Sequence, residues 1–453
     1  MHFHLRVRWA LAPRSRHGLL FAVVFRALLP TFLGVAACAS PQPPITLSHP
    51  VPSSPRASVG PLRTLVADGR FDDLEPLVAA IGDAHVVALG EPSHLDGAAL
   101  DVKVRLVEFL HERLGFDVIA WEANVWGCEQ MDAQLDDPSS GDVRSIGMGW
   151  PWERAQQVAP LFAYAKATRE TARPLHMAGI DPQFSINDLQ WRFRDWLVVV
   201  AERALVLTPE QRAQLLEAFT RFPKTRSFAP LSIEVRAHDR AVFQALHQRL
   251  AGTSDRDRSL ALRALEAVDA LYRWHEDVHA DVSTKIAWDD HVALNNVRNA
   301  AMADTLLWLR TQRFPGQRIV VWGANVHIAR TTAGLDLAGT KLKPEAFRDN
   351  HSMGEALARA LGRDYFAIAS TAFEGTIGNP PRSPPHPLES SPPGSLEARI
   401  AKQYPLAAWV DLQAFDPSPS VARFIGYQTI GADWGAVFDA AIVMHTMTPV
   451  VGD

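Results

Sequence analysis

The sequence is poor in cysteine: only Cys38 and Cys128 occur among its 453 residues. A disulfide framework is therefore not the source of stability, and a hydrophobic core must hold the fold together. We expect Cys128 to be a small buried apolar side chain rather than a nucleophile. Long runs of like charge are also missing, and the net charge is −5. Nucleic-acid binding requires a basic surface that displaces counterions, so the sequence argues against that class of partner.

Two other patterns are absent. There is no Gly-x-Ser-x-Gly motif, which argues against a serine hydrolase of the α/β type. Ser93 directly precedes His94, and neighbours at a strand end point to opposite sides, so the two are not expected to act as nucleophile and base. No repeat with a period of about 20 to 50 residues is present either, which excludes a solenoid or propeller.

The N-terminal segment, residues 1–37, has the composition of an export signal. A basic head without acids precedes an apolar stretch, and Val35-Ala36-Ala37-Cys38 resembles a bacterial lipobox. We expect lipidation of Cys38, with a plain signal peptide or an N-terminal anchor as the alternatives. Cleavage before Cys38 would remove five arginines and no acid, which changes the net charge from −5 to −10. The prediction is an exported cell-envelope protein on the periplasmic or outer face of a bacterial membrane, held through this lipid alone.

A mostly parallel α/β sheet is predicted for the folded part. A short apolar run ends at Gly90, an amphipathic helix covers residues 96–114, and a second strand covers 116–122. A strand, a helix and a strand within so short a stretch form a βαβ unit, which implies parallel pairing. Further strands are predicted at 174–181, 318–323, 365–372 and 438–444.

The same pass along the chain predicts its organisation. Residues 38–61 are rich in proline and serine and are expected to form a tether. A first α/β part covers 62–186 and a second covers 314–453. Between them, residues 187–313 have helical periodicity almost throughout, which predicts a helical insertion. The proline-rich segment 378–394 is expected to be an exposed loop and a candidate lid.

The chemistry is expected at the carboxyl ends of the parallel strands, where ligands bind in open α/β sheets. Two predicted strands end in Gly-x-x-x-His, at His94 and His327, and two others end in an acid, Glu122 and Asp181. Four such endings favour one shared site. A histidine can take a proton from water, a neighbouring carboxylate such as Glu91 can fix its tautomer, and a nearby cation can hold an oxyanion. The candidate cations are Lys103, Arg105 and Arg298.

These residues resemble the erythromycin esterase family. The resemblance rests on Gly90-Glu91-x-Ser93-His94, Lys103-x-Arg105, Gly115-Phe116 with Glu122, Glu153, Gly179-Ile180-Asp181-x-Gln183, Arg298 with Met302, and Asn325-x-His327. It implies an α/β hydrolase that cleaves a carboxylic ester or lactone, with water activated at His94. Glu91, Glu122, His327 and Arg298 would belong to the same catalytic site, and substrate would be bound by Lys103, Arg105, Glu153, Asp181 and Asn325. The sequence departs from the family pattern at Leu95, Asn299 and Gly323-Ala324. The implied partner is a small-molecule ester, and no cofactor is expected.

Three other functions stay open. His275-Glu276-x-x-His279 fits the zinc-peptidase pattern H-E-x-x-H, although no glutamate lies between His279 and Glu345 to complete the usual ligand set. A haem-binding envelope lipoprotein is the second alternative, with His94 or His327 as iron ligand. The third keeps hydrolysis but adds a divalent metal at the same histidines and acids, as in Tiki-type proteases, whose fold is similar to the one expected here.

Overall fold

A computed structural model of the chain gives its fold. It describes residues 58–150, 152–184, 189–222, 232–279, 295–342, 349–381, 383–415 and 420–452, together with residues 344 and 347. Within 232–279 the side chains are described up to Trp274. The predicted signal, Cys38 and the tether up to residue 57 lie outside the described residues.

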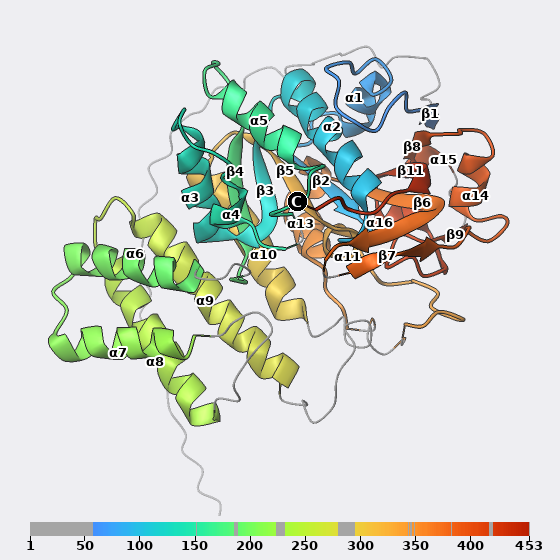
Figure 1. The fold of residues 1–453 in the computed structure, drawn as a ribbon. Coiled ribbons are helices and arrows are strands. Elements are labelled where there is room, and N and C mark those ends of the chain that lie inside the picture. The colour runs from blue at the N-terminus through green and yellow to red at the C-terminus, as the bar shows by residue number, and fades with distance from the viewer. Residues whose placement is uncertain are drawn as a thin grey trace, which may run out of the picture. The chain divides into compact units, whose positions relative to one another are not determined.

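The described residues form a mixed, mostly parallel sheet (Figure 1). Its spatial order is β1-β8-β11-β6-β2-β5-β3-β4, and β7 pairs with β6. The six strands from β11 to β4 run parallel, whereas β8, β1 and β7 pair antiparallel. The strands are β1 Val59–Pro61, β2 Val86–Glu91, β3 Phe116–Asn124, β4 His176–Asp181, β5 Arg318–Ala324, β6 Tyr365–Asn379, β7 Ser383–Leu388, β8 Ala407–Asp411 and β11 Ala440–Met447; β9 Ser420–Ala422 and β10 Ile430–Ala432 form a separate hairpin.

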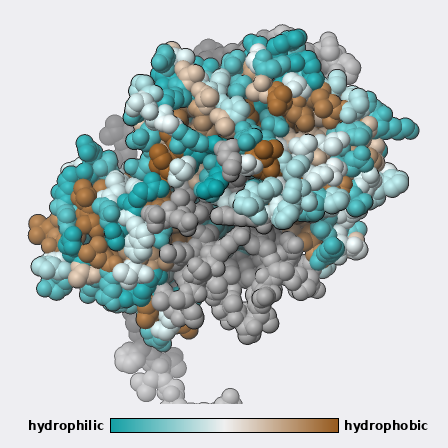
Figure 2. All heavy atoms as spheres, viewed as in Figure 1, coloured by the Kyte–Doolittle hydropathy of each residue, from teal (hydrophilic) through white to brown (hydrophobic). Residues whose placement is uncertain are grey.

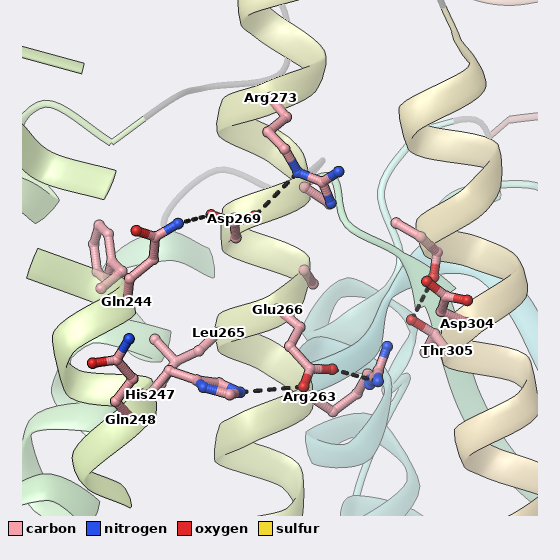
Figure 3. A pocket seen from close by; sticks show the side chains of 14 residues that line it. Gln244, His247, Gln248, Arg263, Leu265, Glu266, Asp269, Arg273, Asp304 and Thr305 are labelled. Carbon is pink, nitrogen blue, oxygen red and sulfur yellow. Dashed lines mark hydrogen bonds and ion pairs between the residues drawn. The ribbon is translucent and has the colours of Figure 1, made fainter. Parts of the chain in front are cut away.

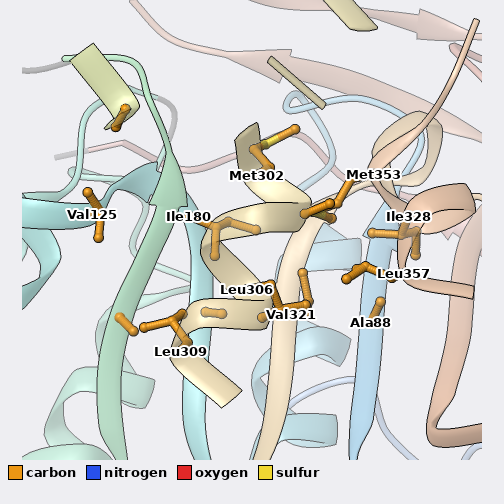
Figure 4. Close-up of a cluster of buried hydrophobic side chains, with 14 of the residues drawn as sticks. Ala88, Val125, Ile180, Met302, Leu306, Leu309, Val321, Ile328, Met353 and Leu357 are labelled. Atoms are coloured by element: carbon orange, nitrogen blue, oxygen red, sulfur yellow. The ribbon is translucent and has the colours of Figure 1, made fainter. Parts of the chain in front are cut away.

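Helices cover both faces of this sheet because strand residues alternate between them. Ala88 and Val321 face one core, where they meet Met302 and Leu306 of α10 (Figure 4). Leu89, Trp121 and Trp322 face the other core, which α1, α2 and α5 complete. The helices are α1 Glu75–Ile81, α2 Gly97–Leu114, α3 Val125–Leu135, α4 Arg144–Gly147, α5 Ala159–Thr168, α10 Asn296–Trp308, α11 Asn325–Ile328, α13 Met353–Leu361, α14 Leu396–Ala401, α15 Leu412–Phe415 and α16 Trp434–Val437.

The helical region between β4 and β5 contains α6 Leu189–Ala204, α7 Pro209–Thr220, α8 Ile233–Ala251 and α9 Arg258–His279. Its helices pack through aromatic rings; the ring centroids of Phe219 and Phe243, for example, lie 5.1 Å apart in a T-shaped contact. Thr208 begins α7 with a capping box to Gln211, and Pro209 occupies the first turn, where its missing N–H leaves no bond unmade. The insertion of helices that the periodicity predicts is therefore present between these two strands.

The structure differs from the sequence prediction at β1, β8 and β7, among other places. Val59–Pro61, assigned to the tether, forms β1 and pairs with β8. The strand β8, Ala407–Asp411, was not predicted because two alanines and a terminal aspartate make its apolar run weak. The proline-rich segment 378–394 is not wholly a loop, because Ser383–Leu388 pairs with β6. Proline lacks an N–H to donate and is tolerated in a strand with one open edge, which is how β7 lies.

Among the described residues no helix is both long and apolar enough to cross a membrane. On the face shown in Figure 2, hydrophobic side chains lie in separate patches between hydrophilic ones. Scattered patches of this kind are ordinary for a folded surface and indicate no particular partner.

Candidate active site

The strand order brings the four predicted strand ends side by side. β5 lies between β2 and β3, and β4 follows β3. In register, Glu91 at the end of β2 is paired with Ala324 at the end of β5, and Asn124 of β3 with Asp181 of β4. Because all four strands are parallel, their carboxyl ends meet at one edge of the sheet. Segments as far apart as residues 91 and 324 thus supply one site.

His94 is the most exposed of the five predicted catalytic side chains. Its side chain is 27% exposed, whereas that of Glu91 is fully buried. His94 Nδ1 lies 3.0 Å from Glu91 Oε1, and the Trp150 and Trp152 rings lie nearly perpendicular to the imidazole with centroids 6.2 and 5.2 Å away. A neutral imidazole that donates its Nδ1 proton to Glu91 keeps the lone pair of Nε2 available. The ring is therefore oriented as a base.

The pKa of His94 is raised above its ordinary value. Burial alone would lower it, but the hydrogen bond to Glu91 and the negative charges of Glu122 and Glu91 outweigh that effect. The carboxylates thus favour the protonated imidazole, which is the state that a general base reaches after it takes a proton from water.

Lys103 is buried and contacts Glu91 from the interior of the protein. Its ammonium pairs with Glu91 Oε2, lies 3.3 Å from the carbonyl oxygen of Gly323 and sits 4.2 Å from the centroid of the Trp322 ring. Burial lowers the pKa of Lys103, although the charge of Glu91 opposes the shift. The side chain is 1% exposed. The ammonium therefore neutralises Glu91 and is not placed to contact a substrate.

A second cluster is centred on the guanidinium of Arg298, from α10. Its Nε and Nη2 donate to the two oxygens of Asp181 at 3.1 and 2.6 Å, and Nη2 also donates to Glu122 Oε1 at 2.6 Å. Nη1 lies 3.0 Å from His327 Nε2. Ala324 N–H donates to Glu122 Oε2 at 3.0 Å. Glu122, Asp181, His327 and Arg298 are all buried, so this cluster unites four of the predicted residues.

The charges in this cluster compensate one another. Burial would raise the pKa of Glu122, but its interactions with His327 and with the positive charge of Arg298 hold it well below its usual range. Conversely, burial would lower the pKa of Arg298, and the carboxylates of Asp181 and Glu122 raise it instead. A buried ion pair of this kind is stable only while every partner is present.

Asn299 is a member of the site that sequence reasoning did not select. Its Oδ1 lies 2.7 Å from His327 Nδ1, and its Nδ2 donates to the carbonyl oxygen of His351 at 2.9 Å. A guanidinium can only donate, so His327 Nε2 accepts from Arg298 and the His327 proton is on Nδ1, facing Asn299. The sequence offered one hint of this role: Asn299 directly follows Arg298 and is one of the departures from the family pattern.

Asn325 supports the site rather than facing a substrate. Its Nδ2 donates to the carbonyl oxygens of Ser370 and Phe424 at 2.8 and 2.7 Å, and Oδ1 accepts from Ser370 N–H at 3.3 Å. Gly90 permits this approach, because a Cβ there would lie 2.2 Å from Asn325 Oδ1. These contacts tie Asn325, at the end of β5, to the middle of β6 and to the segment that follows β9.

Two other residues that were predicted to bind substrate, Arg105 and Glu153, are not joined to the site residues by a hydrogen bond or ion pair in the described part of the chain. The Arg105 guanidinium pairs with Asp73 and donates to the carbonyl oxygens of Thr64 and Arg70. These contacts tie α2 to the segment before α1. Glu153 is half-buried next to Trp152, and no ion pair of its carboxylate is recorded among the described residues.

Among the residues that the structure describes, no three His, Cys, Asp or Glu side chains could hold a metal ion together. The physical reason at this edge is that Arg298 lies between Glu122, Asp181 and His327 and supplies the positive charge itself. The side chains of His275, Glu276 and His279 lie outside the described residues.

A separate hollow of about 630 Å³ lies between α8, α9 and α10 (Figure 3). Its polar side chains largely pair with one another: Asp269 binds Gln244 and Arg273, and Glu266 binds His247 and Arg263. None of the predicted site residues lines it.

Comparison with known proteins gives the family of the chain. The model of the family described as erythromycin esterase matches residues 111–447. The chain belongs to the erythromycin esterase family. The matched range includes Glu122, Asp181, Arg298 and His327, and it begins after Glu91 and His94.

Two similar proteins match most of the length of the chain. "Putative hydrolase YbfO" of Bacillus subtilis (strain 168) is 23% identical over 402 residues, which are 84% of this chain and 87% of that protein. "Erythromycin esterase type II" of Escherichia coli is 24% identical over 331 residues, 68% of this chain and 74% of that protein.

Two solved structures share the fold. A succinoglycan biosynthesis protein superimposes with a TM-score of 0.69 at 17% identity and covers 87% of this chain and 95% of its own. The erythromycin esterase EreC, a mutant in its open conformation, superimposes with a TM-score of 0.66 at 17% identity and covers 87% of this chain and 99% of its own.

Proposed function

We propose that the protein hydrolyses a carboxylic ester or lactone with a water molecule activated by His94. One observation carries the proposal: His94 is held at Nδ1 by the buried carboxylate of Glu91 while its ring stays partly exposed at the carboxyl edge of the sheet. The erythromycin esterase family and a relative named as a hydrolase support the reaction class.

The reaction begins when His94 Nε2 takes a proton from water. The water oxygen forms a bond to the carbonyl carbon, and the π electron pair of the C=O bond moves onto the carbonyl oxygen. When this tetrahedral intermediate collapses, the carbonyl re-forms and the bond to the alcohol oxygen breaks. The proton held by His94 then passes to that oxygen. One ester and one water become one carboxylic acid and one alcohol; a lactone opens to a hydroxy acid.

The buried charges have distinct parts in this proposal. Glu91 orients the imidazole and stabilises its protonated form, and Lys103 supplies the counter-charge of Glu91. Glu122 adds a second negative charge that acts on the pKa of His94. Arg298, Asp181, His327 and Asn299 hold Glu122 in place. No step in this chemistry requires a metal or another cofactor, and the proposed partner is a small-molecule ester.

The experiment compares wild type, His94→Ala and His85→Ala on a panel of 4-nitrophenyl esters and lactones, with erythromycin included, each with and without chelator. His85 precedes β2 at the opposite end of the strand that leads to His94, so it is a matched control. We expect His94→Ala to lose at least 100-fold in kcat/KM, with the control and the chelator having no effect. Full activity of His94→Ala refutes the proposal, and activity lost only with chelator favours the peptidase or metal-dependent alternatives.

We also propose that the mature protein is a lipoprotein of the cell envelope, on the basis of residues 1–38. Expression of wild type and Cys38→Ser with a radiolabelled fatty acid tests this. Label and membrane association should be present in the wild type and lost in the variant; an unlabelled wild type would point to a plain signal peptide or anchor instead.

A further inference from the structure

The imidazole of His94 has two neighbours to which the proposed reaction assigns no part. The rings of Trp150 and Trp152, from the segment between α4 and α5, have their centroids 6.2 and 5.2 Å from that of His94, with interplanar angles of 88° and 78°. Trp152 is buried and Trp150 is half-buried, whereas the side chain of His94 is 27% exposed. Both tryptophans therefore pack against the proposed base itself, at a place that solvent reaches.

One hydrogen bond does not fix the orientation of an imidazole. The contact of His94 Nδ1 with Glu91 Oε1, at 3.0 Å, restrains one corner of the ring. The ring can still turn about its Cβ–Cγ bond, a torsion whose preferences are broad in histidine. Two indoles that lie nearly perpendicular to the imidazole oppose this motion, because a turned ring would meet them. Aromatic pairs of this kind are favourable at centroid distances of about 4.5 to 7 Å, a range that includes both observed values.

Trp152 also belongs to a closed series of contacts that begins and ends at this imidazole. Three indole rings follow one another, with centroid distances of 6.1 Å from Trp152 to Trp121 and 4.5 Å from Trp121 to Trp322. An ammonium lies 4.2 Å from the centroid of the last ring and pairs with the carboxylate that bonds the imidazole. The members in order are His94, Trp152, Trp121, Trp322, Lys103 and Glu91. All but His94 are buried, so the rings exclude water from the carboxylate, and its hydrogen bond is stronger there than in water.

The backbone fixes the segment of the two tryptophans relative to His94. The N–H of Gln156 donates to the carbonyl oxygen of Val451 at 2.8 Å, and the N–H of Gly97 donates to the carbonyl oxygen of Thr448 at 2.7 Å. One short stretch near the C-terminus therefore holds both the tryptophan segment and the start of α2, three residues after His94. A side chain that must keep a ring in place is effective only when its own position is fixed in this way.

We propose that Trp150 and Trp152 are positioning residues that act through His94. They hold the plane of the imidazole, so that Nδ1 remains on Glu91 and Nε2 remains available to the attacking water. Without them the ring can turn, exchange its bond to Glu91 for one to water, and adopt the other tautomer. The path of the proton is unchanged, because neither indole takes or gives one. This assignment rests on the proposed ester hydrolysis and adds two residues to its site.

The first test observes the imidazole itself, without substrate. Proton–nitrogen correlation NMR spectra, recorded at a pH at which the ring is neutral, distinguish the two tautomers, and His94→Ala identifies the signals of His94. The wild type should carry the proton on Nδ1. In Trp150→Leu and Trp152→Leu the shifts of the two ring nitrogens should move towards each other, because the tautomers mix. Trp308→Leu is the matched control, since Trp308 is 5% exposed and lies at the end of α10 opposite to Arg298; it should leave these shifts unchanged.

The second test measures the same variants on the 4-nitrophenyl ester that the wild type hydrolyses fastest. Misplacing a catalytic group by about 1 Å can cost about 100-fold in rate. Trp152→Leu should therefore lose about 10- to 100-fold in kcat, with KM changed less than about threefold. Trp152→Phe keeps an aromatic ring beside His94 and should recover most of kcat. Trp308→Leu should match the wild type in kcat even where its melting temperature is lower.

The two measurements together decide the assignment. If His94 keeps the wild-type nitrogen shifts in both leucine variants, the assignment is wrong while the proposed function stands. The same holds if the shifts or kcat change without the other. If Trp152→Leu does not fold, Trp150→Leu decides, because a half-buried side chain can be removed at a smaller loss of stability. If the wild type hydrolyses no ester of the panel, the proposed function fails, and the spectra still show whether the two tryptophans hold the imidazole.

Discussion

Replacing Arg298 by methionine should destabilise the protein severely. The guanidinium donates to both oxygens of Asp181 and to Glu122, and both carboxylates are buried. Methionine fills similar space but leaves two negative charges without a counter-charge. Removing one partner of a buried ion pair typically costs about 3 to 5 kcal/mol, and two orphaned carboxylates place this variant at the upper end of that range.

The pH dependence gives this prediction its specific signature. The pKa of Glu122 is held well below its ordinary value in the folded wild type. Its stabilising contribution is therefore complete above the unfolded pKa, about 4.5, and is lost as the pH falls through the folded pKa. Arg298→Met removes a main cause of that depression. The difference in unfolding free energy between wild type and variant should thus be full from pH 7 down to about pH 4.5 and shrink only below that pH.

Urea unfolding at pH 7 and at about pH 3 measures both effects. Arg203→Met is the control, because Arg203 also bonds two carboxylates, Asp255 and Asp257, but with a side chain that is 36% exposed. Solvent screens such a pair, so its loss should be small. A double variant, Arg298→Met with Asp181→Asn, should recover part of the stability at pH 7. An Arg298→Met protein within about 1 kcal/mol of wild type would refute the view that these charges depend on each other.

Three further predictions follow from the same contacts. In the pH profile of kcat/KM, the acidic limb should have its midpoint above 6.5, because the pKa of His94 is raised and activity requires the unprotonated ring. Glu91→Gln should move that midpoint to lower pH. If the midpoint does not move, the acidic limb does not report the titration of His94. Asn299→Leu removes the acceptor of His327 Nδ1 and should destabilise the fold by about 1 to 3 kcal/mol, whereas Asn299→Asp keeps an acceptor and should be closer to wild type in thermal unfolding; equal losses would contradict the assigned tautomer. Gly90→Ala places a Cβ 2.2 Å from Asn325 Oδ1 and should lower stability by about 1 to 3 kcal/mol. Gly252→Ala is the control, because its added Cβ has its nearest neighbour at 3.6 Å, and it should be neutral or stabilising. Equal melting temperatures of the two variants would refute the close approach of Gly90 to Asn325.

The sequence could predict the strand ends but not the side-chain directions. Gly90, Glu122, Asp181 and His327 follow recognisable apolar runs, and parallel strands necessarily place such endings at one edge. Helix α2, in contrast, is buried over most of its length. Its periodicity therefore gave no means to tell that Lys103 lies beneath Glu91 or that Arg105 points to Asp73.

Contacts between elements distant in the sequence could not be predicted from the sequence for another reason. The bond between Asn299 and His327, and the anchoring of Phe424 by Asn325, depend on how distant elements pack. No local pattern marks β9 and β10 either, because they form a short hairpin of three-residue strands outside the main sheet. The short strand β8 was missed because its apolar run is too weak to recognise.

The position of β5 also bears on the order in which the site can assemble. β5 lies between β2 and β3, yet more than 190 residues separate it from β3 along the chain. A chain that is made or exported from its N-terminus presents Glu91 and Glu122 long before Arg298 and β5 arrive. β2 and β3 cannot pair with each other in the native way until that strand is inserted between them. The contact order of this sheet is therefore high, which favours slow folding, and catalytic competence should appear only late, after the strand that leads to His327 is in place.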